Sequence, residues 1–372
     1  MRRTVIVLPG LIGPDPENSP LLQKLETLRT MTELGELKRL SPLPPMDTPE
    51  AIWLGLPPTE GQLRQGPLTV SALGADPPER STHFHVSLLG YRDGQVVATP
   101  AIVPEEDLRV IVEQAKKLNT RLLTFLAGEN LDHGLVWENV GDMLTPAPPI
   151  GQSLKSNLPE GDAERDLRRF IDDSINLLTS LELNERRLDQ DLPPLNLLWP
   201  WGHAMRKPVP NLVLRRGEPA RVESGSMRLA GLTRLAGYKH GDRHAFGSGV
   251  NTRLEHLAET ALSRDLSIVV FDAPAGLRSS NLQEELHWFV SELDRRLLKP
   301  LFDSALKSRA RLTLVAPGAT TGLALDFEMG NNRANHYPFD ERSLEEKSLP
   351  QVDAWTVIEK ALKPVVDSIA PR

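Results

Sequence analysis

The side chains in this chain that could do chemistry are histidines and carboxylates in small, separate groups. His83 and His85 are two residues apart in a strand-like segment, so their side chains point to one face. Two imidazoles on one face are half of a metal site, although an exposed strand face is the simpler interpretation. The segment His240-Gly241-Asp242-Arg243-His244 also contains ligand types, with a flexible loop as its simpler interpretation.

One carboxylate stands where α/β proteins bind ligands. Asp272 follows the apolar run 266–271, which is typical of a buried parallel strand. Ligands of open α/β sheets bind outside the carboxyl ends of the strands, so Asp272 is a candidate binding residue.

Composition excludes several classes of function. The 372 residues include no cysteine, which excludes disulfides, thiolate catalysis and Cys-ligated metals. No P-loop or dinucleotide fingerprint occurs. The net charge is −7 and acids interleave with the arginine-rich stretches, so we expect no nucleic-acid partner. No apolar run approaches the ~20 residues of a membrane span, and we expect a soluble cytoplasmic protein without a membrane partner.

Short apolar strands alternate with amphipathic helices towards both ends of the chain, which favours an α/β sheet, while the middle has a less regular α+β rhythm. The patterns predict strands over 4–8, 68–73, 82–89, 121–125, 134–137, 211–214, 266–271 and 311–315. They predict helices over 19–34, 105–117, 163–181, 226–235, 253–263, 280–298 and 355–369.

A segment with two tryptophans flanking a proline, Asn196-Leu197-Leu198-Trp199-Pro200-Trp201-Gly202, begins an ordered series of motifs. Alone, it would be a strand end whose indoles cover the core. Upstream stand Asn184 and Arg187, three residues apart. Downstream follow 229–237, 250–252, Phe271-Asp272-Ala273-Pro274 and 292–301. This order resembles the archaeal-type, cofactor-independent phosphoglycerate mutases of the alkaline phosphatase superfamily, over nearly the whole chain.

The resemblance implies a mostly parallel, alkaline-phosphatase-like sheet flanked by helices, with a smaller α+β domain inserted. We expect the first domain to comprise 1–69 and 191–372, and the inserted domain 70–190. The family interconverts 2- and 3-phosphoglycerate with a serine nucleophile and two divalent cations, manganese, zinc or magnesium. The residues that the resemblance suggests for substrate binding are Asn184, Arg187, His203 and Asp272.

The chain departs from the family where the cations are held. Pro9 stands where the family has its first aspartate, and Ala275 and Ser279 replace the Asp and His of another motif. Pro317-Gly318 replaces a later Asp-His pair, and the last family histidine has no clear match. Thr48 takes the place of the nucleophilic serine and is followed by proline instead of aspartate. Proline, alanine and glycine have no side-chain donor for a cation.

These losses favour a non-catalytic regulatory or metabolite-binding relative that uses no metal or other cofactor. Its expected partner is a phosphorylated or carboxylated metabolite, or a protein. The alternative is an active, divergent mutase or metal-dependent phosphatase with two divalent cations held by other residues; a third interpretation is an unrelated α/β protein. The candidates for the alternative site are Asp15, Asp47, Asp272, Asp326 and His336.

Overall fold

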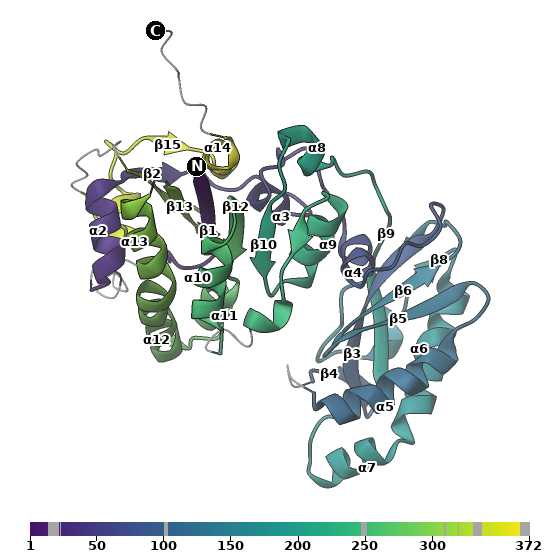
Figure 1. The fold of residues 1–372 in the computed structure, drawn as a ribbon. Helices are drawn as coiled ribbons and strands as arrows, with labels where there is room; N and C mark the ends of the chain where they lie inside the picture. The colour runs from purple at the N-terminus through teal and green to yellow at the C-terminus, as the bar shows by residue number, and fades with distance from the viewer. Residues whose placement is uncertain are drawn as a thin grey trace. The chain divides into compact units, whose positions relative to one another are not determined.

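A computed structural model describes residues 1–13, 22, 24–99, 103–246, 251–308, 310–318, 320–329 and 337–364. The chain forms two compact units (Figure 1). The first unit combines Met1–Gln62 with Val209–Arg372, and the second is Leu63–Pro208. The second unit therefore begins a few residues before the inserted domain predicted from the sequence and ends after it.

The first unit contains an eight-stranded sheet in which one strand is antiparallel to the other seven. That strand is β14, and the arrangement confirms the mostly parallel sheet predicted from the sequence. In spatial order the strands are β11 (Lys239–His240), β10 (Arg221–Ser224), β12 (Leu266–Val270), β1 (Arg2–Val7), β13 (Ala310–Pro317), β14 (Gly322–Glu328), β2 (Glu36–Leu40) and β15 (Gln351–Val352).

The centre of this sheet is buried on both faces, as parallel strands require. Val7 of β1 lies opposite Val270 of β12 and Val315 of β13, so these three parallel strands reach the same level. The segments that follow them therefore meet at one edge of the sheet.

Helices pack on this sheet and bury its strands. Ile6 of β1 shares a core with α2, α10, α12 and α13, whereas Val5 and Val7 point to the opposite face, and α14 contacts β1 and β13. The helical segments of the unit are α2 (Glu26–Leu34), α3 (Glu50–Trp53), α8 (Leu212–Arg216), α9 (Met227–Leu235), η4 (Arg243–Phe246), α10 (Leu254–Leu262), α11 (Ala273–Ser279), α12 (Gln283–Leu293), η5 (Asp294–Leu298), α13 (Lys299–Lys307), η6 (Glu341–Leu344) and α14 (Ala354–Leu362).

The second unit is an antiparallel sheet with helices. Its longest strand, β3 (Thr82–Arg92), pairs with β6 (Asp132–Trp137), β9 (Leu197–Met205) and β4 (Gln95–Val97), and β5 (Leu123–Glu129) pairs with β6. A small pair joins β7 (Met143–Leu144) to β8 (Glu160–Gly161). The helical segments are α4 (Gln65–Ala72), α5 (Glu105–Ala115), η2 (Lys116–Leu118), η3 (Leu154–Asn157), α6 (Glu164–Thr179) and α7 (Glu182–Asp189).

Two predicted strands are helices in the structure. Residues 68–73 belong largely to α4, whose residues Gly66–Ser71 are all buried, so the sequence shows no helical alternation there. Residues 211–214 begin α8, whose cap is the side chain of Asn211 accepting a hydrogen bond from Leu214 N. That cap and Gly217, in the left-handed conformation at the other end, are helix signals that outweigh the apolar run.

Two predicted helices differ at their ends. The described helix α2 begins at Glu26, and most of 19–25 lies outside the described residues. Helix α14 ends at Leu362, earlier than predicted, because Lys363 is already extended before Pro364.

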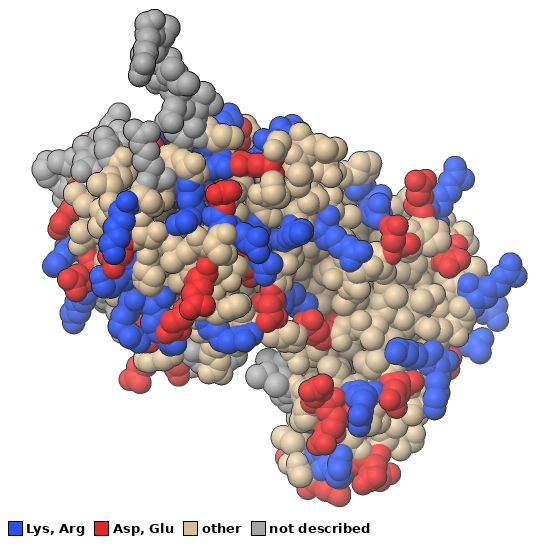
Figure 2. Space-filling model, viewed as in Figure 1, with Lys and Arg blue, Asp and Glu red and all other residues tan. Residues whose placement is uncertain are grey.

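No helix among the described residues is long and apolar enough to cross a membrane. On the face shown in Figure 2, lysine and arginine side chains are intermixed with aspartate and glutamate.

Candidate functional site at the carboxyl edge of the sheet

The segments after β1, β12 and β13 bring together the residues that replace the expected metal ligands. Gly10, after Pro9, donates its backbone N–H to Pro317 O at 3.2 Å. A Cβ on Gly10 would lie 2.5 Å from the Cα of Ala275, and the φ of Gly10 is +74°. Backbone from three segments therefore packs closely at this edge.

A half-buried arginine contacts the same segments. Arg278 of α11 donates from Nε to Gly10 O and from Nη2 to Leu11 O, both at 2.9 Å. Its Nη2 lies 3.9 Å from Oε1 of Glu341, which is only 2% exposed and also accepts Gly13 N. The sequence patterns gave no signal for Glu341, because its partners are far away in the chain.

The residues at this edge do not fit the pair of cations that the resemblance implies. Pro9, Ala275, Pro317 and Gly318 contribute no side-chain donor. Within the described ranges, no three His, Asp or Glu residues are placed to hold a metal ion together. The positive charge near these segments is instead the guanidinium of Arg278.

A recess of about 410 Å³ lies beside this edge, following β10 and β12. We call it the Asp272 recess. The described residues that line it are Gly225, Ser226, Phe246, Thr252, Phe271, Asp272, Ala273, Gly276, Leu277, Ser280 and Leu282.

Asp272 is the ionisable group in the described lining of the recess. Asp272 is an exposed residue, but protein atoms on one side of it displace part of the surrounding water. This desolvation, with the nearby charge of Glu50, raises the pKa of Asp272 to about 6. In the described part of the chain its carboxylate has no hydrogen-bond or ion-pair partner.

Thr48, the candidate nucleophile, lies on the segment leading into α3 and is fully buried. Its backbone N–H donates to Oε1 of Gln62 at 3.0 Å. Asp47 is exposed, and its backbone O accepts from Arg228, which also binds Glu50. A phosphoryl acceptor must be reachable, so Thr48 would have to move before it could react.

The other three predicted site residues, Asn184, Arg187 and His203, lie in the second unit. Asn184 is fully buried and donates to Leu178 O at 2.8 Å and Leu195 O at 3.1 Å, while its Oδ1 accepts Leu195 N at 2.7 Å. Arg187 Nε donates to Pro193 O at 2.8 Å. Both residues therefore hold the connection between α7 and β9.

His203 of β9 is half-buried, and its Nδ1 lies 2.7 Å from Thr145 Oγ1. Burial, together with the charge of Arg64, lowers its pKa, so the imidazole is neutral near pH 7. His203 belongs to the second unit and is not among the described residues that line the Asp272 recess. The role of these three residues in substrate binding stays a prediction.

Replacing Asn184 with alanine separates a structural role from a binding role. We expect a loss of about 3 kcal/mol in the free energy of unfolding, since buried backbone groups lose their partners. The measurement is denaturant unfolding followed by tryptophan fluorescence, to which Trp199 and Trp201 near this connection contribute. Asn176→Ala, at an exposed position on α6, should stay within about 0.5 kcal/mol of the parent. Equal stability of both variants would contradict the structural role.

The histidine pair on β3 is buried, so the exposed-face interpretation is wrong. His83 and His85 are 2% and 3% exposed. His85 Nδ1 lies 2.9 Å from Thr69 Oγ1, and its Nε2 lies 3.2 Å from Asp132 Oδ1. His83 Nε2 contacts Ser81 Oγ at 2.9 Å, and burial lowers the pKa of His83 to about 4. These imidazoles fasten the sheet to α4 and to neighbouring segments.

The remaining candidates are engaged elsewhere or lie outside the described residues. In the loop at 240–244, Asp242 binds Arg253 at 2.9 Å and accepts the N–H of His244. Asp326 is paired with Arg311 inside the sheet. Asp15 and His336 lie outside the described residues.

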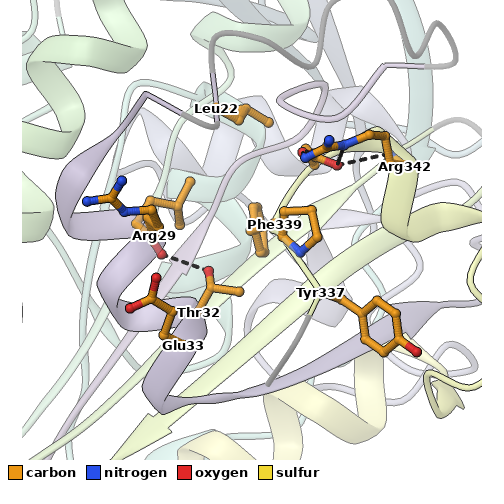
Figure 3. A pocket seen from close by; sticks show the side chains of 10 residues that line it. Leu22, Arg29, Thr32, Glu33, Tyr337, Phe339 and Arg342 are labelled. Carbon is orange, nitrogen blue, oxygen red and sulfur yellow. Dashed lines mark hydrogen bonds and ion pairs between the residues drawn. The ribbon is translucent and has the colours of Figure 1, made fainter. Parts of the chain in front are cut away.

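A second recess, of about 370 Å³, lies between α2 and residues 337–342 (Figure 3). Its described lining contains two acids and two arginines: Glu33, Asp340, Arg29 and Arg342. Asp340 is fully buried and bound to Arg342. The described lining residues therefore carry no net charge that would select a charged ligand.

Comparison with known proteins shows which proteins this chain and its fold resemble. No family model matches the chain. A probable 2,3-bisphosphoglycerate-independent phosphoglycerate mutase of Geobacter sulfurreducens is 24% identical over 276 residues, 70% of this chain and 69% of that protein. The corresponding mutase of Methanopyrus kandleri is 23% identical over 346 residues, 84% of this chain and 80% of that protein.

Two solved structures share the fold. One is the PH0037 protein of Pyrococcus horikoshii, with a TM-score of 0.73, 16% identity and coverage of 98% of this chain and 99% of that one. The other is the cofactor-independent phosphoglycerate mutase of Thermoplasma acidophilum, with a TM-score of 0.62, 18% identity and coverage of 97% and 99%. The fold is thus that of a cofactor-independent phosphoglycerate mutase. The chain is a homologue of the archaeal-type, 2,3-bisphosphoglycerate-independent mutases, which confirms the resemblance found in the sequence.

Proposed function

We propose that this protein is a non-catalytic relative of the phosphoglycerate mutases that keeps their fold and binds a small metabolite. The observation that supports this proposal is the packing of Gly10 on Ala275 and its hydrogen bond to Pro317. Backbone and a guanidinium lie at the loops where the resemblance expects carboxylates and imidazoles.

Phosphoryl transfer between two cations needs side chains that clamp the attacking and leaving oxygens through the metals. The residues that replace the expected ligands are proline, alanine and glycine, and Arg278 is occupied by two main-chain carbonyls. A serine-like hydroxyl alone would have to act without that charge, and Thr48 is buried.

The proposed ligand also follows from the family resemblance. A relative that keeps the fold of a mutase is proposed to bind a small metabolite, and the resemblance suggests a phosphorylated or carboxylated compound. A protein partner is the second, and the cytoplasm is the proposed location.

The test is a mutase assay on protein purified without chelator. With 3-phosphoglycerate and added Mn²⁺, Zn²⁺ or Mg²⁺, we expect no formation of 2-phosphoglycerate above the protein-free rate. The mutase of Methanosarcina mazei is the positive control. Metal-dependent turnover that disappears in Thr48→Val would contradict the proposal and establish the active, divergent mutase instead.

A further inference from the structure

The described residues that line the Asp272 recess carry a net negative charge. Its described lining contains one acid, Asp272, and neither lysine nor arginine. The nearby carboxylate of Glu50 is paired with Arg228, which donates to it from Nε at 2.7 Å and from Nη2 at 3.3 Å. The carboxylate of Asp272 can therefore accept hydrogen bonds from a ligand in the recess.

The neighbouring arginines are engaged with other groups. Arg228 also donates to Asp47 O at 2.6 Å, and Arg243 Nε donates to Gly225 O at 3.2 Å. Arg278 is held by Gly10 O and Leu11 O. A phosphate or carboxylate in the recess would face Asp272 without a guanidinium among its described lining residues, and like charges repel.

The rest of the lining suits a small, partly polar molecule. Ser226 and Ser280 present hydroxyl groups that can donate to a ligand, and Phe246, Phe271 and Leu277 supply apolar surface. The volume of about 410 Å³ lies within the usual range of small-molecule sites. A Cβ added to Gly276 would meet no atom within 4 Å, so the space beside this residue is open.

We propose that the Asp272 recess binds a small metabolite that carries a primary ammonium group together with hydroxyl groups. The ammonium group binds the carboxylate of Asp272 with charge-assisted hydrogen bonds, and Ser226 and Ser280 bind the hydroxyl groups. This inference rests on the proposed metabolite-binding function and names the ligand class for it. It replaces the anionic ligand expected from the resemblance with a cationic one.

The ionisation of Asp272 agrees with this assignment. Its pKa of about 6 leaves the carboxylate charged above pH 7. The charge of Glu50 also raises that pKa, and Glu50 is itself bound to Arg228. Binding of an ammonium group should therefore weaken as the pH falls through about 6.

The test uses three probes that share a three-carbon skeleton: 3-amino-1,2-propanediol, glycerol and 3-phosphoglycerate. Each is titrated into the full-length protein at pH 7.5, with binding followed by the backbone amide NMR signals of Ser226, Gly276 and Ser280. We expect the amine to bind with a dissociation constant at least tenfold lower than that of glycerol. 3-Phosphoglycerate should leave these signals unchanged.

Three variants test whether the amine binds in the Asp272 recess. Asp272→Asn should weaken binding of the amine about tenfold or more, since the neutral amide lacks the ionic component. Asp265→Asn, at the amino end of the same strand, removes the same charge from an exposed position and should leave binding unchanged. Gly276→Leu fills the open space without changing charge and should abolish the signal shifts.

Equal binding of the amine by the parent and Asp272→Asn, no binding of the amine, or shifts of these signals by 3-phosphoglycerate would each overturn the inference. The mutase assay distinguishes this failure from failure of the proposed function. An inactive protein that fails these titrations refutes the ligand class alone, whereas metal-dependent turnover refutes the proposed function.

Discussion

Gly10→Ala is expected to lower the free energy of unfolding by about 3 kcal/mol or more. Gly10 has φ +74°, a conformation that disfavours a side chain, and its added Cβ would lie 2.5 Å from Ala275 Cα. Backbone cannot move aside as a flexible side chain can, so the loop after β1 would separate from α11. Denaturant unfolding monitored by circular dichroism measures the loss.

Gly217→Ala is the matched control, because it isolates the conformational part of that loss. Gly217 has φ +73° in the same unit, and a Cβ there would meet nothing within 4 Å. We expect it to lose about 1 kcal/mol. Equal losses for the two variants would show that the edge near Ala275 is open, and the closed edge that supports the proposed function would be refuted.

Arg311→Met should lower the free energy of unfolding by 3 to 5 kcal/mol, about the loss typical of a broken buried ion pair. Arg311 and Asp326 are 7% and 12% exposed. The guanidinium donates to both carboxylate oxygens, and Thr313 Oγ1 donates to Oδ1 at 2.9 Å. Without Arg311, the carboxylate of Asp326 would be left buried and uncompensated.

The pH dependence identifies the cause of that loss. Burial opposes ionisation of Asp326, but the hydrogen bonds and charge of Arg311 outweigh it and lower its pKa. In the parent, this stabilisation is present above the unfolded pKa of about 3.9 and is lost as the pH falls through the lower folded value. In Arg311→Met the pKa of Asp326 should lie above its usual value, so the difference from the parent should shrink between pH 7 and pH 4.

The double variant Arg311→Met with Asp326→Leu provides a second control. It removes both charges and should recover most of the stability, because no unpaired charge remains. A double variant as unstable as Arg311→Met, with a loss independent of pH, would contradict the ion-pair explanation. Asp326 would then again be a candidate ligand for the alternative, active mutase.

The sequence predicted the α/β class correctly because the central strands are short apolar runs between helices, and the family resemblance added the mostly parallel sheet. It failed for α4, whose residues Gly66–Ser71 are all buried, since a helix buried on every side shows no periodicity. It also failed for the burial of His83 and His85. Their alternation with apolar residues indicates two faces, but it cannot tell that α4 covers the polar one.

The site was only partly predictable from the sequence. Asp272 could be found because it follows a buried strand, and its place in the recess agrees with that rule. The contacts of Arg278 with Gly10, Leu11 and Glu341 join segments far apart in the chain, and no local pattern encodes them. For Asn184, the sequence showed a motif but not that its amide binds main-chain groups of its own unit.

The most direct test of the central claim is the metal content of the protein after dialysis against Mn²⁺ or Zn²⁺ and removal of free metal. We predict less than about 0.2 equivalents of bound metal by mass spectrometry, because the described residues at the carboxyl edge offer no pair of cation sites. Retention of about two equivalents, lost on chelation together with mutase activity, would contradict the account.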